Sequence, residues 1–160
     1  DYGTIEFRIC DTQRSMRKLE MLTAMAQSLV HQSVIDYNDG CLLDSFKMEY
    51  LNDALWKACR FPLNVNMIDP ETDESSTLLE QIRKMINYTN DSLEHFNNTH
   101  VINEIDKICK VGTEGDDQIK VYNKFGFEGL RKYLKGEPFK FEVKLMTRGL
   151  GEAILVLGEK

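Results

Sequence analysis

Two side chains of opposite charge, Glu6 and Arg8, stand two positions apart near the start of the chain. A glutamate offers the hard oxygen atoms that Mg²⁺ prefers, and the planar fork of an arginine matches a phosphate or a carboxylate. The pair could therefore form one wall of a site that binds magnesium and a phosphorylated substrate. A commoner use is an ion pair on a solvated face, which contributes only about 0–1 kcal/mol. These two residues alone leave both interpretations open.

The stretch around this pair, residues 2–12, alternates in polarity and predicts a β-strand. Successive side chains of a strand point to opposite faces, so residues two positions apart share a face. Glu6 and Arg8 would then project side by side. One face of this strand is apolar and the other is polar: Ile5, Phe7 and Ile9 against Thr4, Glu6, Arg8 and Cys10.

Length and composition predict a globular protein of one domain. The chain has 160 residues, enough for a core of its own, and 42% of them are hydrophobic and 29% charged. The net charge of −6 disfavours nucleic acid as a partner. No apolar run approaches the ~20 residues of a membrane helix, so we expect no membrane partner. The chain begins almost inside the predicted strand, and we interpret it as part of a longer protein.

The cysteines and histidines lack the spacing of a disulfide framework or a metal site. The cysteines are scattered, at Cys10, Cys41, Cys59 and Cys109. The histidines are His31, His95 and His100. We interpret the cysteines as thiols of a reducing cytoplasm and expect the protein there.

Apolar residues at helical spacing predict five to six helices. These cover about 16–37, 45–60, 77–96, 101–109, 116–125 and 127–135. Ser15 is a candidate N-cap, Thr77 and Glu80 have capping-box spacing, Asp116 is a candidate cap of the fifth helix, and Gly126 suits a left-handed stop. A short strand over 65–68 precedes a predicted turn at 69–73.

The last part of the chain differs from its helical middle. Residues 139–145 alternate with period two, 148–151 indicate a turn and 152–157 a buried strand, which together predict a β-hairpin. The predicted fold is therefore α+β and mainly helical. Its N-terminal strand and C-terminal hairpin form a small antiparallel sheet packed by the helices. We expect a single domain over 1–160, in which 138–160 form the hairpin tail.

The opening strand, followed by a long helix rich in Ala, Leu and Met, resembles the carboxylate–amine ligases of the bacterial glutamate–cysteine ligase type. Three later segments resemble that family in its order: Lys57-Ala-Cys-Arg-Phe61, Ile68-Asp-Pro-Glu-Thr72 and Gly112-Thr-Glu-Gly-Asp-Asp-Gln-Ile-Lys-Val-Tyr122. The resemblance covers residues 2 to about 135, so 1–137 is identified as the C-terminal part of a ligase-type catalytic domain. The hairpin tail has no counterpart, and Pro62 stands where the family usually has a glycine.

This resemblance implies a glutamine-synthetase-like fold, in which an antiparallel sheet forms the floor of the active site. It also implies that ATP, with Mg²⁺, phosphorylates a carboxylate, typically that of glutamate, which an amine then attacks, typically that of cysteine. Glutamine synthetases carry a similar Arg-x-Glu-x-Arg strand. By that likeness Glu6 is a magnesium ligand, and Arg8 is the catalytic clamp on the phosphoryl group and the substrate carboxylate. Thr4 replaces the first arginine, and Arg60 is implied as a second substrate-binding residue.

Three functions follow from these observations. The first is the C-terminal portion of such a ligase, inactive by itself because the family's first half supplies further metal-binding carboxylates and much of the nucleotide site. The second is a non-catalytic helical module derived from that fold, which mediates oligomerisation. The third is an unrelated helical domain with a surface ion pair. We expect small-molecule substrates for the first, and a homo-oligomer because an uncovered sheet edge favours self-association.

Overall fold

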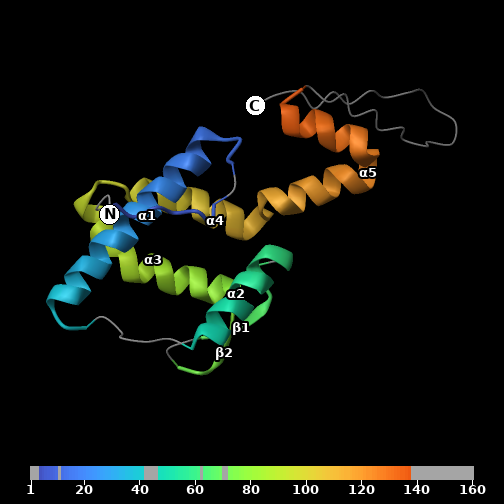
Figure 1. The fold of residues 1–160 in the computed structure, drawn as a ribbon. Helices are drawn as coiled ribbons and strands as arrows, with labels where there is room; N and C mark the ends of the chain where they lie inside the picture. Colours follow the sequence, from blue (N-terminus) through green and yellow to red (C-terminus); the bar gives the residue numbers. More distant parts are fainter. Residues whose placement is uncertain (1–3, 11, 42–46, 62, 70–71, 138–160) are drawn as a thin grey trace, which may run out of the picture. The chain divides into compact units, whose positions relative to one another are not determined.

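The computed structural model describes residues 4–10, 12–41, 47–61, 63–69 and 72–137. The chain divides into two compact units, Asp1–Gly112 and Thr113–Lys160. The first contains α1 (Met16–Asn38), α2 (Met48–Arg60), β1 (Asn66–Ile68), β2 (Ser75–Thr77), α3 (Leu78–His95), the 3₁₀-helix η1 (Thr99–Val101) and α4 (Ile102–Val111) (Figure 1). The second contains α5 (Glu114–Lys135). The mainly helical fold with a small antiparallel sheet is confirmed, and the single domain over 1–160 stays a prediction.

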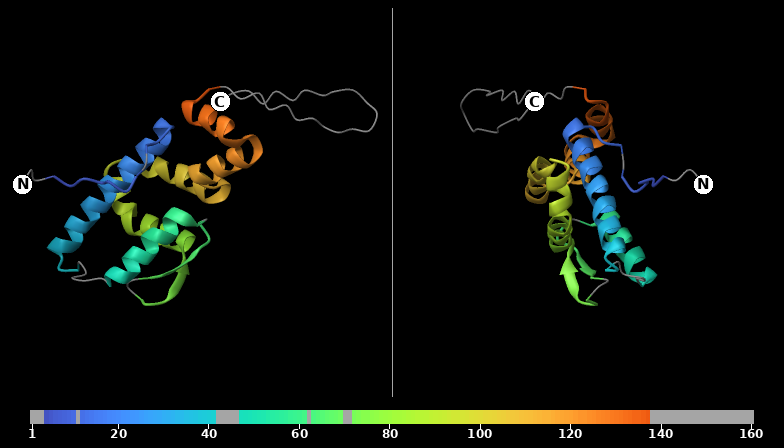
Figure 2. Two further views of the ribbon diagram at one scale, coloured as in Figure 1. Left: turned by 45° about the vertical axis from the view of Figure 1, so that its right-hand side comes forward. Right: turned by 90° about the vertical axis from the view of Figure 1, so that its left-hand side faces the viewer.

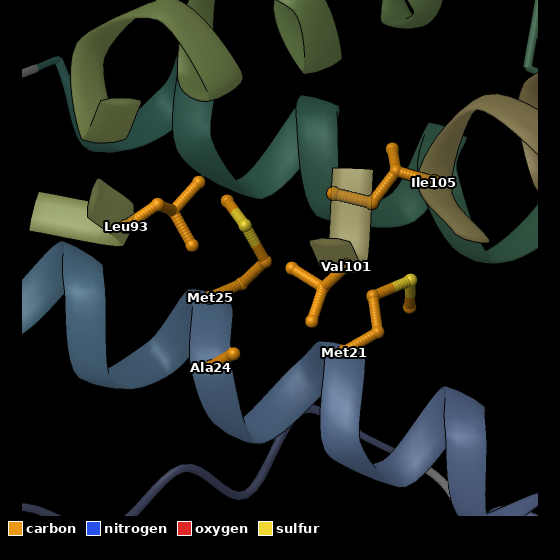
Figure 3. Close-up of a cluster of buried hydrophobic side chains, with 6 residues drawn as sticks. All are labelled: Met21, Ala24, Met25, Leu93, Val101 and Ile105. Carbon is orange, nitrogen blue, oxygen red and sulfur yellow. The ribbon is translucent and has the colours of Figure 1, made fainter. Parts of the chain in front are cut away.

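The core of the first unit lies between α1 on one side and α3, η1 and α4 on the other. Its apolar side chains come from both sides and point toward one another (Figure 3): Met21, Ala24, Met25, Leu93, Val101 and Ile105. Leu93 is completely buried and Ala24 is 4% exposed. Burial of each larger side chain contributes about 1.5–3 kcal/mol, so this stripe holds α1 in place.

The sheet of the described residues is a hairpin of β1 and β2. Its antiparallel register pairs Asn66 with Thr77 and Ile68 with Ser75. The predicted strand over 65–68 is confirmed as β1, which also contacts α2. The sequence of β2, Ser-Ser-Thr, is polar throughout and shows no alternation, so it does not by itself indicate a strand.

The predicted N-terminal strand is wrong. Residues 4–10 belong to no strand and contain a bend at Ile9. A strand exists only where its backbone pairs with another, and no described residue forms a backbone hydrogen bond with residues 4–10. Among the described residues, the small sheet consists of β1 and β2. The predicted hairpin over 139–157 lies outside the described residues.

The caps of α3 follow the prediction. Thr77 is the N-cap of α3, and its Oγ1 accepts a hydrogen bond from the Glu80 N–H at 3.2 Å. Glu80 Oε2 in turn accepts from the Thr77 N–H at 2.6 Å, which completes the capping box. Ser15 is the N-cap of α1, as predicted, although its side chain makes no capping hydrogen bond.

The described part of the second unit is a kinked helix. Gly126 interrupts α5 with φ 65° and ψ −165°, so the predicted fifth and sixth helices are two arms of one element (Figure 2). This positive φ favours glycine, and the predicted break is confirmed. The N-cap is Thr113, and Asp116 is its capping-box partner in the first turn rather than the cap itself. Thr113 and Asp116 are three positions apart, as in a capping box, and the threonine has the extended backbone of an N-cap.

Candidate functional site

The predicted site pair, Glu6 and Arg8, is brought together by the structure. Arg8 Nη2 donates to Glu6 Oε2 at 2.8 Å, and the side chains are 80% exposed for Arg8 and 67% for Glu6. A contact between residues two apart requires that both project from one face, as the alternation predicted. In the described chain the pair is therefore a solvated ion pair, and its two groups are accessible to a ligand.

The other face of the same segment lies over α1. Ile5 and Phe7 line a cavity of about 390 Å³ whose remaining wall is the C-terminal half of α1, formed by Leu29, Val30, Ser33, Val34 and Tyr37. Glu6 and Arg8 do not line this cavity. The segment thus keeps the predicted separation of an apolar and a charged face, although no described residue pairs with its backbone.

Arg60, the third predicted site residue, is the last residue of α2 and does not join the pair. Its guanidinium lies 5.5 Å from the centroid of the Trp56 ring, a cation–π distance. Trp56 also meets the Phe61 ring edge-on at 5.4 Å. Arg60 is thereby oriented by α2 and its aromatic neighbours, and the part of the chain that the structure describes shows no contact between Arg60 and either Glu6 or Arg8.

The donor set of these residues does not by itself fit a magnesium–nucleotide complex. Magnesium requires six oxygen atoms in near-ideal octahedral geometry, commonly from one or two carboxylates, phosphates and waters. Glu6 is one exposed carboxylate, already bonded to Arg8. Within the described ranges, no group of three or more His, Cys, Asp or Glu side chains could hold a metal ion. Further ligands have to come from outside these residues.

A buried carboxylate that the sequence analysis did not select is Asp69, at the end of β1. Its side chain is 3% exposed and accepts a hydrogen bond from Gln81 Nε2 at 2.9 Å. The Lys84 ammonium contacts the same carboxylate. Buried charges require such partners. The only signal in the sequence was the resemblance of Ile68-Asp-Pro to a family segment, because the partners lie on α3 and their proximity depends on the hairpin.

A polar network also crosses from α1 to α3. Gln32 Nε2 donates to Asp36 at 3.0 Å, which turns the Gln32 carbonyl oxygen toward Ser92 Oγ at 3.2 Å. Ser92 donates its proton to that oxygen and must accept from His31 Nδ1, 2.9 Å away. Neutral His31 therefore carries its proton on Nδ1.

The His31 ring stacks on His95, with centroids 4.8 Å apart and planes 11° apart. Imidazole lone pairs lie in the ring plane, so two parallel stacked rings cannot direct them at one ion about 2.0–2.1 Å from each. The two histidines are in contact through their faces, and the ring of Phe96 lies nearly perpendicular to both, at centroid distances of 5.0 and 4.8 Å. This arrangement serves the packing of α1 on α3.

The family model described as "Glutamate-cysteine ligase family 2 (GCS2)" matches residues 2–138. The chain belongs to this family. A protein of Sorangium cellulosum named "Putative glutamate--cysteine ligase 2" is 23% identical over 121 residues, which are 76% of this chain and 32% of the relative. A protein of the same name from Gloeobacter violaceus is 36% identical over 72 residues, 45% of this chain and 19% of the relative.

The match to these relatives extends over most of this chain, but it spans only about a third of each relative's own length. No solved structure matches it, so the glutamine-synthetase-like fold stays a prediction. None of the helices in the described part of the chain is long and apolar enough to cross a membrane.

Proposed function

We propose that this chain is the C-terminal part of the catalytic unit of an ATP-dependent carboxylate–amine ligase of the glutamate–cysteine type. The observation that supports this most is the family match over residues 2–138. It includes the Glu6–Arg8 segment and the end of α2 that carries Arg60. In the relatives, about two thirds of the length lies outside the matched region.

The proposed reaction has two steps. The γ-phosphoryl group of ATP passes to the side-chain carboxylate of glutamate, which releases ADP and leaves an acyl phosphate. The amine of cysteine then attacks the acyl carbon, an amide bond forms, and phosphate and a proton leave. Both steps move negative charge between oxygen atoms, so cationic groups around the phosphoryl oxygens stabilise them.

Arg8 is the proposed clamp on these oxygens. Its planar guanidinium can make two parallel hydrogen bonds to a phosphoryl group or a carboxylate. The bond that it now makes to Glu6 is between exposed groups, and exposed ion pairs contribute little, so substrate oxygens can replace it. Arg60 is the proposed second substrate-binding residue, held by its contact with Trp56.

Glu6 is the proposed contribution of this chain to a magnesium site, and it is insufficient alone. The missing ligands are expected from the two thirds of the ligase length that this chain does not span. We therefore expect little or no ligase activity from this chain alone. The substrates of the complete ligase are then small molecules. The exposed free cysteines Cys10, Cys41 and Cys59 fit a reducing compartment such as the cytoplasm.

The test uses coupled measurement of ADP release with Mg-ATP, glutamate and cysteine. The chain of 160 residues should show no turnover, and robust turnover would contradict the proposal that it is incomplete. The complete open reading frame that contains this sequence should be active. In that protein Glu6→Gln should weaken Mg-ADP binding, and Arg8→Lys should lower kcat/KM by about 10–100-fold because lysine keeps the charge but loses the fork.

A matched control comes from the exposed ion pair of Glu128 and Arg131 on α5. Arg131 Nη2 lies 2.5 Å from Glu128 Oε1. Glu128→Gln and Arg131→Lys make the same changes in the second compact unit and should leave ADP release unchanged. If Glu6→Gln binds Mg-ADP as the unmodified protein does, Glu6 is not a metal ligand.

A further inference from the structure

Helix α2 exposes its apolar face to solvent. The large apolar side chains of α2 recur at helical spacing and are exposed: Met48 by 61%, Leu51 by 41%, Leu55 by 53% and Trp56 by 54%. Phe61 follows the helix, is 42% exposed, and its ring centroid lies 5.4 Å from that of Trp56. These five residues form the α2 patch. No residue of α2 is buried, so the described part of the chain leaves this patch uncovered.

The opposite face of α2 is the one that packs on its own unit, where the helix contacts β1 (Figure 1). The half-buried residues of α2 are Tyr50, Asp53, Ala54 and Lys57. At about 100° per residue, the centre of this set lies opposite the centre of the α2 patch. The packed face even includes an ion pair, with Lys57 Nζ 2.7 Å from Asp53 Oδ2. A surface helix normally buries its apolar stripe and exposes its charges, and α2 does the reverse.

We propose that the α2 patch docks on the part of the ligase polypeptide that this chain does not span. This inference rests on the proposed function, to which it adds the surface that joins the two parts. The match spans only about a third of each relative's length, so a large part of such a ligase lies outside it. A contiguous exposed apolar surface commonly marks an interface, and here the polypeptide contains a further part that can cover it.

Arg60 favours this partner over any other. It is the last residue of α2, and its guanidinium lies 5.5 Å from the centroid of the Trp56 ring, which belongs to the α2 patch. In the proposed ligase, Arg60 binds substrate together with ligands from the rest of the polypeptide. That polypeptide then has to approach the C-terminal end of α2. Docking there removes water from the contact of Arg60 with Trp56, which strengthens a cation–π interaction and orients the guanidinium.

The composition of this face defines the surface that fits it. Two further residues of α2 share the face with the patch, Asn52 and Cys59, and neither is charged. The centre of an interface is typically depleted of charged residues and well packed. The docking surface of the remaining polypeptide should therefore be apolar opposite Leu51 and Leu55, and should carry its polar groups toward Arg60.

Alkylation of Cys59 tests the docking without a substitution. Cys59 is an exposed free cysteine on the patch side of α2. Its reaction with iodoacetamide, followed by mass spectrometry, should be at least about tenfold slower in the complete ligase than in this chain alone, because access controls the rate. In urea, Cys59 should react at one rate in both proteins.

Two results of this measurement would overturn the proposal. The first is an equal rate for Cys59 in the two folded proteins. The second is a Cys59 that is already protected in this chain alone, because a second copy or another segment of the same chain would then cover the patch. A complete protein that releases ADP but leaves Cys59 reactive would refute the docking and keep the ligase proposal.

The double variant Leu51→Gln with Leu55→Gln gives a second measurement. Glutamine has nearly the helix propensity of leucine, and both leucines are exposed in this chain, so its thermal midpoint should change by no more than about 1 °C. In the complete ligase the midpoint should fall by about 5 °C or more, because two leucines leave an apolar interface. Glu49→Gln, on α2 but outside the patch, should leave both midpoints within about 1 °C. Equal shifts of the double variant in the two proteins would contradict the docking.

Discussion

The carboxylate of Asp69 accepts a hydrogen bond from Gln81 Nε2 at 2.9 Å. The side chain of Asp69 is only 3% exposed. Gln81 lies in the first turn of α3 and also donates to Ser76 Oγ at 2.7 Å. The Asp69 N–H donates to the Glu74 carbonyl at 2.8 Å, which closes the turn between the two strands. Asp69 therefore ties the β1–β2 hairpin to α3.

Asp69→Ala should lower the free energy of unfolding by about 1–3 kcal/mol, because the substitution leaves the Gln81 amide without this acceptor. Lys84→Ala should also lower it, because this substitution leaves the carboxylate of Asp69, which is 3% exposed, without the ammonium that balances its charge. Urea unfolding followed by circular dichroism measures both. A Lys84→Ala variant as stable as the unmodified chain would show that the ammonium does not stabilise the buried carboxylate.

The network from Asp36 to His31 predicts one tautomer. Long-range ¹⁵N–¹H correlation spectra of the neutral imidazole should show the proton of His31 on Nδ1. Ser92→Ala removes the acceptor and should cost about 1 kcal/mol of stability, with a mixture of tautomers at His31. His100, which contacts Glu20 at 2.9 Å, should keep its spectrum in this variant. A proton on Nε2 of His31 in the unmodified chain would reverse the inferred direction of the hydrogen bonds.

Substitution by alanine should have opposite effects on stability at two glycines of α5, Gly129 and Gly115. A β-carbon at Gly129 would overlap Phe125 Cβ and lie 3.3 Å from its Cγ, whereas one at Gly115 meets only Thr113 Oγ1 at 3.5 Å. Gly129→Ala should therefore destabilise α5 by about 1–3 kcal/mol. Gly115→Ala should stabilise it by about 0.5–1 kcal/mol through the helix propensity of alanine.

Thermal unfolding of the two alanine variants gives the comparison. If both shift the midpoint in the same direction, the contact between Phe125 and Gly129 does not limit position 129. Phe125→Ala keeps the β-carbon that a β-carbon at position 129 would overlap, so Gly129→Ala should stay destabilising in a Phe125→Ala background.

The two capping boxes predict a loss of stability in acid. The Thr77 N–H holds the pKa of Glu80 below its usual 4.5, and the Thr113 N–H holds the pKa of Asp116 below its usual 3.8. A carboxyl whose pKa is lowered by folding stabilises the folded state above its unfolded pKa, and this stabilisation is lost as the pH falls through the folded pKa. Stability should therefore decline as the pH falls below about 4.5.

Glu80→Gln and Asp116→Asn should each flatten this decline, measured as urea midpoints across the acid range. Thr77→Ala should lower stability by about 0.5–2 kcal/mol at every pH, yet it keeps the backbone N–H and so most of the pH dependence. A Glu80→Gln variant with an unchanged pH profile would show that the carboxylate is not responsible.

Local features were predictable from the sequence because their causes are local. The capping box of Thr77 and Glu80 joins residues three positions apart, and Gly126 breaks a helix through its own φ. The contact between Glu6 and Arg8 follows from two residues on one face of an extended stretch. In each case the interacting groups are brought together by a few backbone dihedral angles.

The tertiary structure alone decided which backbone segments pair and which side chains are buried. Residues 4–10 alternate like a strand, but a strand needs the hydrogen-bonding groups of another segment, and no described segment supplies them. Asp69 is buried, and His31 lies on His95, because α3 returns past β1 and α1. Such contacts join positions far apart in the chain, so their presence depends on packing, which no local pattern encodes.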